Sequence, residues 1–173
     1  MTAHETVPPA QEGVVSLRPF VVRRAARWSD CDPAGVVYAG HFPLYMLDAC
    51  HLFGEHVLKP ALPPGISHRA PGKGLELEFL SSLWPGDQFD MEVHPAGTGA
   101  HTVHLLIAAR RVDDARPVFL GRMTSIHVSA DDRTIAVPVP PEIRAALDAY
   151  AARSSPIPGI LHKLSPATRF AKG

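Results

Sequence analysis

Residues 27–41 read RWSDCDPAGVVYAGH, and residues 42–59 continue as FPLYMLDACHLFGEHVLK. The second stretch is apolar on nearly every side of a helix, and Pro43 is tolerated because it falls in the first turn. The few polar side chains of this region step by three, four or seven residues, which puts them on one narrow stripe. They are His41, Asp48, His51, Glu55 and Lys59. We expect a buried helix over residues 40–59, and we interpret the stripe as a solvent-facing seam in preference to a catalytic row.

The sequence that follows this helix predicts an antiparallel sheet. Turn formers such as Trp84-Pro85-Gly86-Asp87 and Gly97-Thr98-Gly99 separate short segments with strand-forming residues. Such short connections make neighbouring strands antiparallel. The expected strands are residues 75–82, 88–95, 101–112 and 118–130.

Two further elements flank these segments. Residues 16–28 alternate loosely and predict a first strand, whereas residues 141–153 begin with proline and predict a final helix. A single twisted sheet buries an apolar helix only by curling around it, with a second subunit covering the remainder. We therefore expect an α+β domain that dimerises. It would have a five-stranded antiparallel sheet curled around a long central helix, plus a C-terminal helix.

The length of 173 residues predicts one domain with one core. We expect a flexible N-terminal tail at residues 1–15, the folded domain at residues 16–152, and a Pro-rich basic tail at residues 153–173. The composition of the C-terminal tail allows either disorder or a strap that lies on another surface.

Composition argues against several classes of function. The 17 basic residues balance the 17 acidic residues, so no net field attracts nucleic acid or an anionic membrane. The first residues lack a basic start followed by an apolar stretch, and no apolar run is long enough to span a bilayer. We expect a cytoplasmic protein without a nucleic-acid or membrane partner.

The histidines and cysteines do not have the spacing of a metal site. His101 and His104 are three residues apart on an expected strand, which puts them on opposite faces. Cys31 and Cys50 have no Cys-x-x-Cys partner, and without an export signal they are expected to be reduced thiols. We expect no metal, no cofactor and no disulfide.

The turn before the helix combines two features that a reaction site needs, a carboxylate and unpaired backbone N–H groups. Asp32 lies in this turn, and the unpaired backbone N–H groups of the helix start, near residues 38–41, can receive developing negative charge. Each well-placed donor would stabilise a tetrahedral oxyanion by about 3–4 kcal/mol. Asp30 and Asp32 also suit a simpler role, capping the turn by accepting nearby N–H groups, and we assign that role to Asp30.

The segment Asp-x-Asp-Pro-Ala-Gly-Val-Val-Tyr, residues 30–38, resembles the signature of the 4-hydroxybenzoyl-CoA thioesterase family, in its Asp-on-the-loop branch, which has the hot-dog fold. The resemblance extends over residues 16–135 and includes the Gly-Asp turn at residues 86–87. It implies that Asp32 is catalytic and that the N–H groups of Ala39 and Gly40 bind the thioester oxygen. It also implies edge-to-edge dimers, often paired into tetramers, with active sites at subunit interfaces. The chain departs from the family at Ala39, where relatives often have Tyr or His, and at Phe42, where they commonly have Tyr.

We therefore expect an acyl-CoA thioesterase that hydrolyses a small acyl- or aroyl-CoA, with Asp32 acting as a nucleophile or as a general base. Tyr38, His41, Arg69 and Lys73 are the candidate substrate-binding residues, although Tyr38 also suits plain packing and His41 a helix cap. Further candidates for the coenzyme A phosphates are Arg110, Arg111 and Arg122. The alternatives are an acyl-carrier-protein thioesterase, a hot-dog dehydratase, for which no Asp-x-Asn-Pro-x-His segment is present, and a non-catalytic acyl-binding module.

Overall fold

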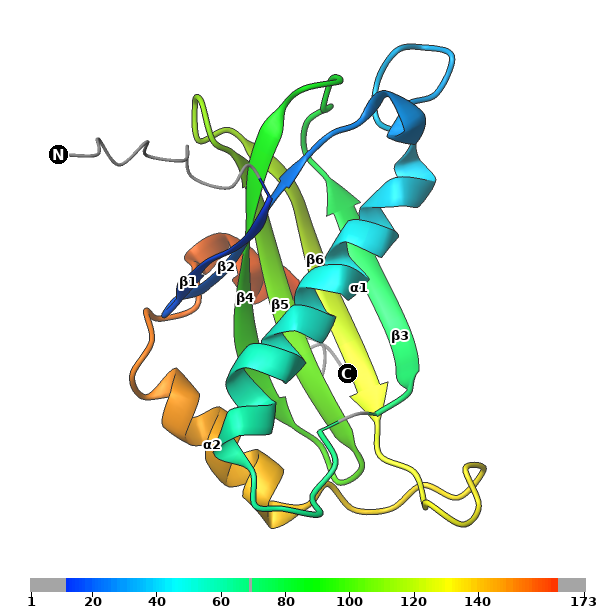
Figure 1. The fold of residues 1–173 in the computed structure, drawn as a ribbon, viewed down its shortest axis with the longest axis vertical. Helices are drawn as coiled ribbons and strands as arrows, with labels where there is room; N and C mark the ends of the chain where they lie inside the picture. The colour runs from blue at the N-terminus through cyan, green and yellow to red at the C-terminus, as the bar shows by residue number, and fades with distance from the viewer. Residues whose placement is uncertain (1–11, 69, 165–173) are drawn as a thin grey trace, which may run out of the picture.

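A computed structural model describes residues 12–68 and 70–164, which form one antiparallel sheet with a helix on its inner face (Figure 1). The strand order across the sheet is β1-β2-β4-β5-β6-β3. The strands are β1 (Gly13–Leu17), β2 (Phe20–Ala25), β3 (Gly72–Phe79), β4 (Gln88–Thr98), β5 (Thr102–Arg111) and β6 (Pro117–Ile126). The two α-helices are α1 (Phe42–Phe53) and α2 (Pro141–Ala151). This arrangement is the expected hot-dog fold.

The helix α1 runs diagonally across the sheet and supplies the centre of the core (Figure 1). Its buried side chains, Phe42, Met46, Ala49 and Phe53, recur at helical spacing on the face toward the sheet. Gly121 on β6 allows the closest approach, because a Cβ there would lie 2.1 Å from the sulfur of Met46. The absence of a side chain at this position therefore fixes how near α1 lies to the sheet.

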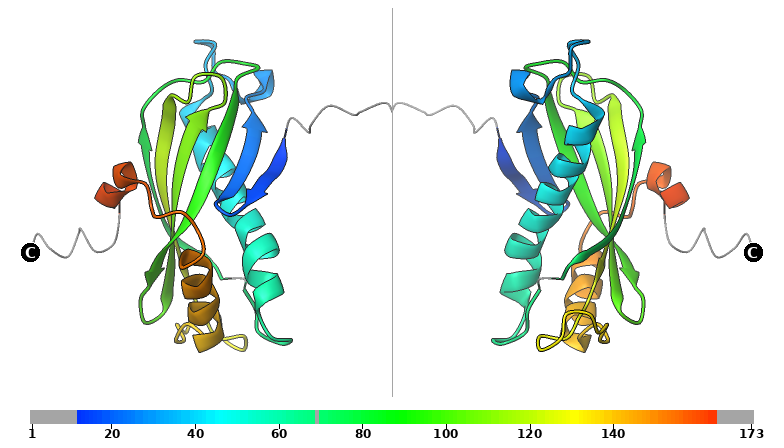
Figure 2. Two further views of the ribbon diagram at one scale, coloured as in Figure 1. Left: turned by 90° about the vertical axis from the view of Figure 1, so that its left-hand side faces the viewer. Right: turned by 90° about the vertical axis from the view of Figure 1, so that its right-hand side faces the viewer.

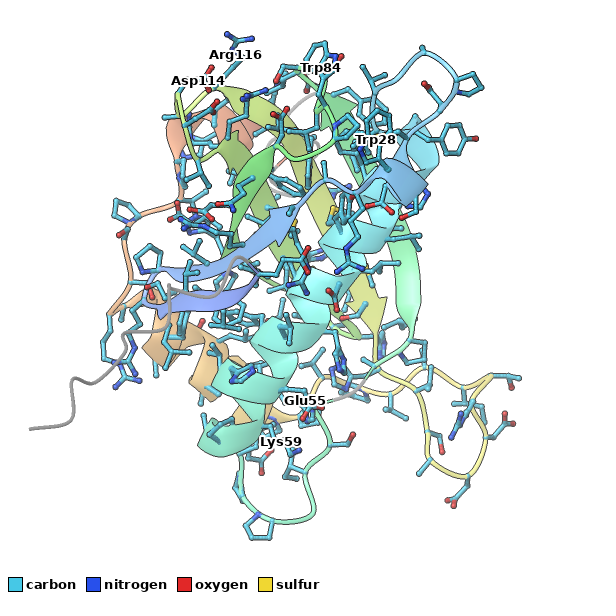
Figure 3. The ribbon with its side chains drawn as sticks, turned by 45° about the horizontal axis from the view of Figure 1, so that its top comes forward. Trp28, Glu55, Lys59, Trp84, Asp114 and Arg116 are labelled. Atoms are coloured by element: carbon cyan, nitrogen blue, oxygen red, sulfur yellow. The ribbon has the colours of Figure 1, made fainter. Side chains whose placement is uncertain are left out.

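The outer face of α1 is uncovered within one chain. Leu44 is 57% exposed, and Asp48 forms an ion pair with Arg24 of β2. Glu55 bonds Lys59 at 2.8 Å (Figure 3) and His68 at 3.0 Å. Of the polar stripe, Asp48, His51 and Lys59 are exposed in the single chain, whereas His41 and Glu55 are half-buried.

The sheet has six strands where five were predicted. Residues 16–28 were expected to form one strand, but the chain turns at Arg18 and Pro19, so that β1 and β2 form an antiparallel hairpin. Proline has no N–H for a strand ladder, and its fixed φ suits a turn. Because β1 begins at Gly13, the sheet also includes the last residues of the expected N-terminal tail.

The expected helix over residues 40–59 is helical but not uniformly α-helical. A turn of 3₁₀-helix, η2 (Ala39–His41), leads into α1, and a π-helical segment, η3 (Gly54–Leu58), follows it. A further 3₁₀ turn, η4 (Lys59–Ala61), contains Pro60, which cannot donate a backbone hydrogen bond. Neither α1 nor any other helix in the described part of the chain is long and apolar enough to cross a membrane.

The described part of the C-terminal tail is a strap on the outer face of the sheet (Figure 2). After α2, the segment η5 (Gly159–Leu164) packs Leu161, which is fully buried, against Leu106, Ala108 and Leu120. Lys163 forms an ion pair with Glu78 of β3 at 2.5 Å. Of the two alternatives for this tail, the strap is therefore correct up to residue 164.

Candidate active site

The loop between β2 and α1 is closed by its own backbone. Cys31 and Val37 form an isolated antiparallel bridge. Within this bridge, the N–H of Asp32 donates to the carbonyl of Val36 at 2.9 Å, and the N–H of Gly35 donates to the carbonyl of Asp32 at 2.9 Å. Gly35 has a φ of 80°, a conformation that glycine adopts without steric cost. The turn therefore holds the backbone of Asp32 in a defined position.

The carboxylate of Asp32 is partly engaged by this turn. Its Oδ1 accepts the N–H of Ala34 at 2.8 Å, which is the capping contact expected of Asp in a turn. Its Oδ2 makes no hydrogen bond within residues 12–68 and 70–164. One oxygen therefore fixes the side chain, while the other is available to a substrate or to water.

Asp30 anchors the loop to α1. Its Oδ2 accepts the hydroxyl of Tyr45 at 2.5 Å and the N–H of Arg27 at 3.2 Å, while its carbonyl accepts the N–H of Tyr38 at 2.8 Å. Burial alone would raise the pKa of Asp30, but the hydrogen bonds from Tyr45, Arg27 and Ser29 outweigh it and lower the pKa below its ordinary value. Asp30 therefore has the structural role that we assigned to it.

Two unpaired N–H groups lie at the start of the helix. Neither Ala39 nor Gly40 donates a backbone hydrogen bond in the described residues, and both are exposed. Gly40 accommodates the ring of Tyr38, because a Cβ at Gly40 would lie 2.5 Å from a ring carbon of Tyr38. These N–H groups are the orphan donors of the helix start and could bind an anionic oxygen.

The structure brings together only some of the predicted binding residues. The Tyr38 ring is 55% exposed and lies edge-on to His41, with ring centroids 6.4 Å apart. Nδ1 of His41 is 3.8 Å from Oδ1 of Asp30. Lys73, by contrast, lies at the beginning of β3, close enough to His104 on the outer face of the sheet to influence its charge. Arg69 lies outside the described residues.

Two of the further phosphate candidates are already paired with carboxylates. Arg111 bonds Asp87 at 2.6 Å and Asp113 at 2.7 Å, and the side chain of Arg122 forms an ion pair with Glu76. Arg110 is exposed at the end of β5. The expectation that Arg111 and Arg122 bind phosphate does not fit these contacts, because each would have to leave a partner of opposite charge.

Phe79 and Leu83 lie beside the site and were not predicted from sequence. The ring of Phe79, at the end of β3, lies 5.2 Å from that of Phe42 at the start of α1. The carbonyl of Leu83 accepts the N–H of Val37 at 2.9 Å. Trp28 and Trp84, which are 80% and 51% exposed, lie at the same end of the molecule (Figure 3). The segment that leads into the Gly-Asp turn of the sequence signature therefore contacts the loop that holds Asp32.

The two cysteines do not form a disulfide with each other. Cys31 and Cys50 are free thiols, and burial raises the pKa of Cys50 to about 12. Across residues 12–68 and 70–164, no three His, Cys, Asp or Glu side chains are arranged to hold a metal ion. The absence of a metal or cofactor and the cytoplasmic location both stay predictions.

The model of the thioesterase-like superfamily matches residues 26–147, which is more than half of the chain. This range contains the Asp32 loop, α1, all strands from β3 to β6, and most of α2. No curated protein is similar in sequence at a significant level.

Many solved structures share the fold, including the following three. A thioesterase superfamily protein from Jannaschia sp. CCS1 is 26% identical with a TM-score of 0.62, over 76% of this chain and 94% of that one. A thioesterase from Thermus thermophilus, solved with coenzyme A and zinc, is 20% identical with a TM-score of 0.66, over 80% and 98%. A hypothetical protein from Staphylococcus aureus, solved with CoA, is 12% identical with a TM-score of 0.69, over 87% and 92%.

Proposed function

The chain belongs to the thioesterase-like superfamily of thioester hydrolases, and we propose that it hydrolyses a small acyl-CoA with Asp32 as the catalytic carboxylate. The observation that carries this proposal is the pairing of two features on one short stretch. Asp32 has an unbonded carboxylate oxygen among the described residues, and the unpaired N–H groups of Ala39 and Gly40 follow it at the helix start.

Asp32 and the N–H groups at the helix start would have different roles in the reaction. The N–H groups of Ala39 and Gly40 would polarise the thioester carbonyl and stabilise the oxyanion that forms on attack. Asp32 would either attack the carbonyl carbon, giving an anhydride that water then cleaves, or remove a proton from an attacking water molecule. In both routes the C–S bond breaks and coenzyme A leaves as a thiolate. Because a thiolate is a good leaving group, no separate general acid is needed.

Coenzyme A is the proposed carrier of the acyl group. The Thermus and Staphylococcus structures contain coenzyme A, which supports the same carrier here. Lys73, and Arg69 outside the described residues, are the proposed partners of its phosphates. An acyl-carrier-protein thioesterase is the alternative on this scaffold, and only a comparison of both carriers separates the two.

We further propose that the active unit is a homodimer or homotetramer in which β3 pairs with β3 of a second copy. β3 is an edge strand with exposed apolar side chains, including Leu75 at 44% and Phe79 at 53%, and an exposed apolar edge favours pairing with another strand. The exposed face of α1 around Leu44 adds apolar surface that a second subunit can cover.

A panel of acyl-CoAs tests the proposal. Thiol release should be measured with short, medium, long and aromatic acyl-CoAs, together with the same acyl groups on acyl carrier protein. Faster release from at least one acyl-CoA supports the proposed function. Faster release from the protein-bound acyl groups favours the alternative carrier, whereas binding without release identifies a non-catalytic module.

A further inference from the structure

A cavity of about 320 Å³ lies at the end of α1 remote from Asp32. Its roof is formed by the second half of α1 and by η3, from Leu47 to Leu58, and its floor by the inner face of β5 and β6. The wall is mainly apolar, with Phe53, Val103 and Leu105 among its members. A concave apolar space of this size is typical of a small-molecule site.

A few polar groups interrupt this apolar wall. His127, which is only 7% exposed, lines the cavity, and its imidazole forms no hydrogen bond with any residue in the described stretches. Burial, and then the charge of Arg144, lower the pKa of His127 below its ordinary 6.5, so the ring is neutral at pH 7. A neutral imidazole has one N–H donor and one acceptor nitrogen, so a ligand in the cavity can form a hydrogen bond with either. Ser125 supplies a hydroxyl on the same floor.

The strand β3 connects this cavity to the Asp32 loop of a second copy. β3 begins beside the cavity, because Gly72 pairs with the floor residue Ser125. It ends at the start of α1, where Phe79 contacts Phe42. In an antiparallel pair of β3 strands from two copies, the beginning of one strand lies beside the end of the other. The cavity of one subunit is then next to the helix start and the Asp32 loop of its partner.

We propose that this cavity receives the distal part of the acyl group, and that it selects a compact chain ending in an uncharged hydroxyl or ketone oxygen. The inference rests on the proposed function and on pairing through β3. The volume of about 320 Å³ lies at the lower end of the range for small-molecule sites, which favours a compact chain. A terminal hydroxyl or ketone can form a hydrogen bond with the neutral imidazole of His127, which has one donor and one acceptor nitrogen.

Matched substrates test the polar part of this inference. The kcat/KM for thiol release is compared between octanoyl-CoA and 8-hydroxyoctanoyl-CoA. The same comparison is made for the six-carbon and ten-carbon acyl-CoAs and their terminally hydroxylated forms, so that one of the three chain lengths places the hydroxyl near His127. His127→Phe keeps an aromatic ring but leaves the substrate hydroxyl unpaired, so the preference for the hydroxylated substrate should fall by about tenfold. His104→Phe is the control, because it makes the same change on the outer face of β5, where His104 bonds Thr124. An unchanged preference in His127→Phe for all three chain lengths overturns recognition by His127.

Filling the cavity tests its use as an acyl pocket. Cys50→Leu from the helix and Ser125→Leu from the sheet both add volume to the cavity, and melting temperatures show whether each variant is folded. We expect kcat/KM for octanoyl-CoA to fall at least about tenfold in either folded variant, with little change for acetyl-CoA. If the folded variants lower kcat/KM equally for octanoyl-CoA and acetyl-CoA, or lower neither, the inference about the cavity is wrong while the proposed function stands. If the unaltered enzyme hydrolyses no acyl-CoA of the panel, the proposed function fails first and this inference with it.

Discussion

The hydrogen bond between Tyr45 and Asp30 is the contact that fixes the Asp32 loop to α1, and Tyr45→Phe removes it without removing the ring. The hydroxyl of Tyr45 donates to Oδ2 of Asp30 at 2.5 Å, and the Asp30 side chain is 14% exposed. A hydrogen bond to a charged group contributes about 1.5–3 kcal/mol. Because Arg27 and Ser29 still donate to Asp30 in the variant, we take the lower half of this range. Tyr45→Phe should therefore lower the free energy of unfolding by about 1.5–2 kcal/mol, and Tm by about 3–8 °C.

The pH dependence of this loss identifies its origin. Asp30 has a pKa below its ordinary value of 3.8, so it contributes stability above that value, and this stability is lost as pH falls through the folded-state pKa. Loss of the Tyr45 hydroxyl moves the pKa of Asp30 back upward. The difference in unfolding free energy between wild type and Tyr45→Phe, measured by urea unfolding, should be full at about pH 6 and smaller near about pH 3.

Two comparisons make this prediction refutable. Tyr38→Phe removes a hydroxyl with no hydrogen bond in the described residues, so it should change the unfolding free energy by less than about 0.5 kcal/mol. A double-mutant cycle between Tyr45→Phe and Asp30→Asn should give a coupling of about 1 kcal/mol or more. A destabilisation by Tyr45→Phe that equals that of Tyr38→Phe, or that is independent of pH, would refute this account of the loop.

Three further predictions concern the helix start, the interface and coenzyme A. Gly40→Ala should displace the ring of Tyr38, because the new Cβ would lie 2.5 Å from it; the unfolding free energy should therefore fall more when Gly40→Ala is made in the wild type than in a Tyr38→Ala background, and equal losses would contradict the packing. Light scattering should give two or four times the chain mass of 18.7 kDa, and Leu75→Lys on the β3 edge should shift this mass toward the monomer together with a loss of thiol release. Lys73→Ala should raise KM more for an acyl-CoA than for the same acyl pantetheine, which lacks the nucleotide phosphates; equal increases would assign Lys73 elsewhere.

Most of the fold was predictable because it depends on local patterns. The apolar run around Met46 and Phe53 gives the central helix, and the turns at Gly86 and Gly97 separate the strands that form the antiparallel sheet. The hairpin of β1 and β2 was missed because Leu17 and Val21, on either side of Pro19, fit one strand-like pattern across the turn. A pattern of side chains shows that strands are favoured, but a single proline in it does not fix where the chain reverses.

In the candidate site, too, the features that depend on local sequence were predictable, whereas those that depend on contacts between distant residues were not. Asp32 and Ala39 are close in sequence, so a turn before a helix was enough to predict their neighbourhood. The partnership of Asp30 with Tyr45 and the cavity group His127 depend on how helix and sheet pack, which spacing alone does not encode. The same is true of Arg111, whose charge is neutralised by Asp87 from another turn.

The most direct test of the central claim is kcat for acyl-CoA hydrolysis by Asp32→Asn, compared with Asp30→Asn and Asp48→Asn. Asn at position 32 keeps an oxygen that can accept the N–H of Ala34 but removes the negative charge. We predict that kcat falls by at least about 10²-fold in Asp32→Asn while Tm is nearly unchanged, and that Asp48→Asn, on the exposed seam of α1, has little effect. Asp30→Asn should act mainly on stability. Near-normal turnover by Asp32→Asn would contradict the assignment of Asp32 as the catalytic carboxylate.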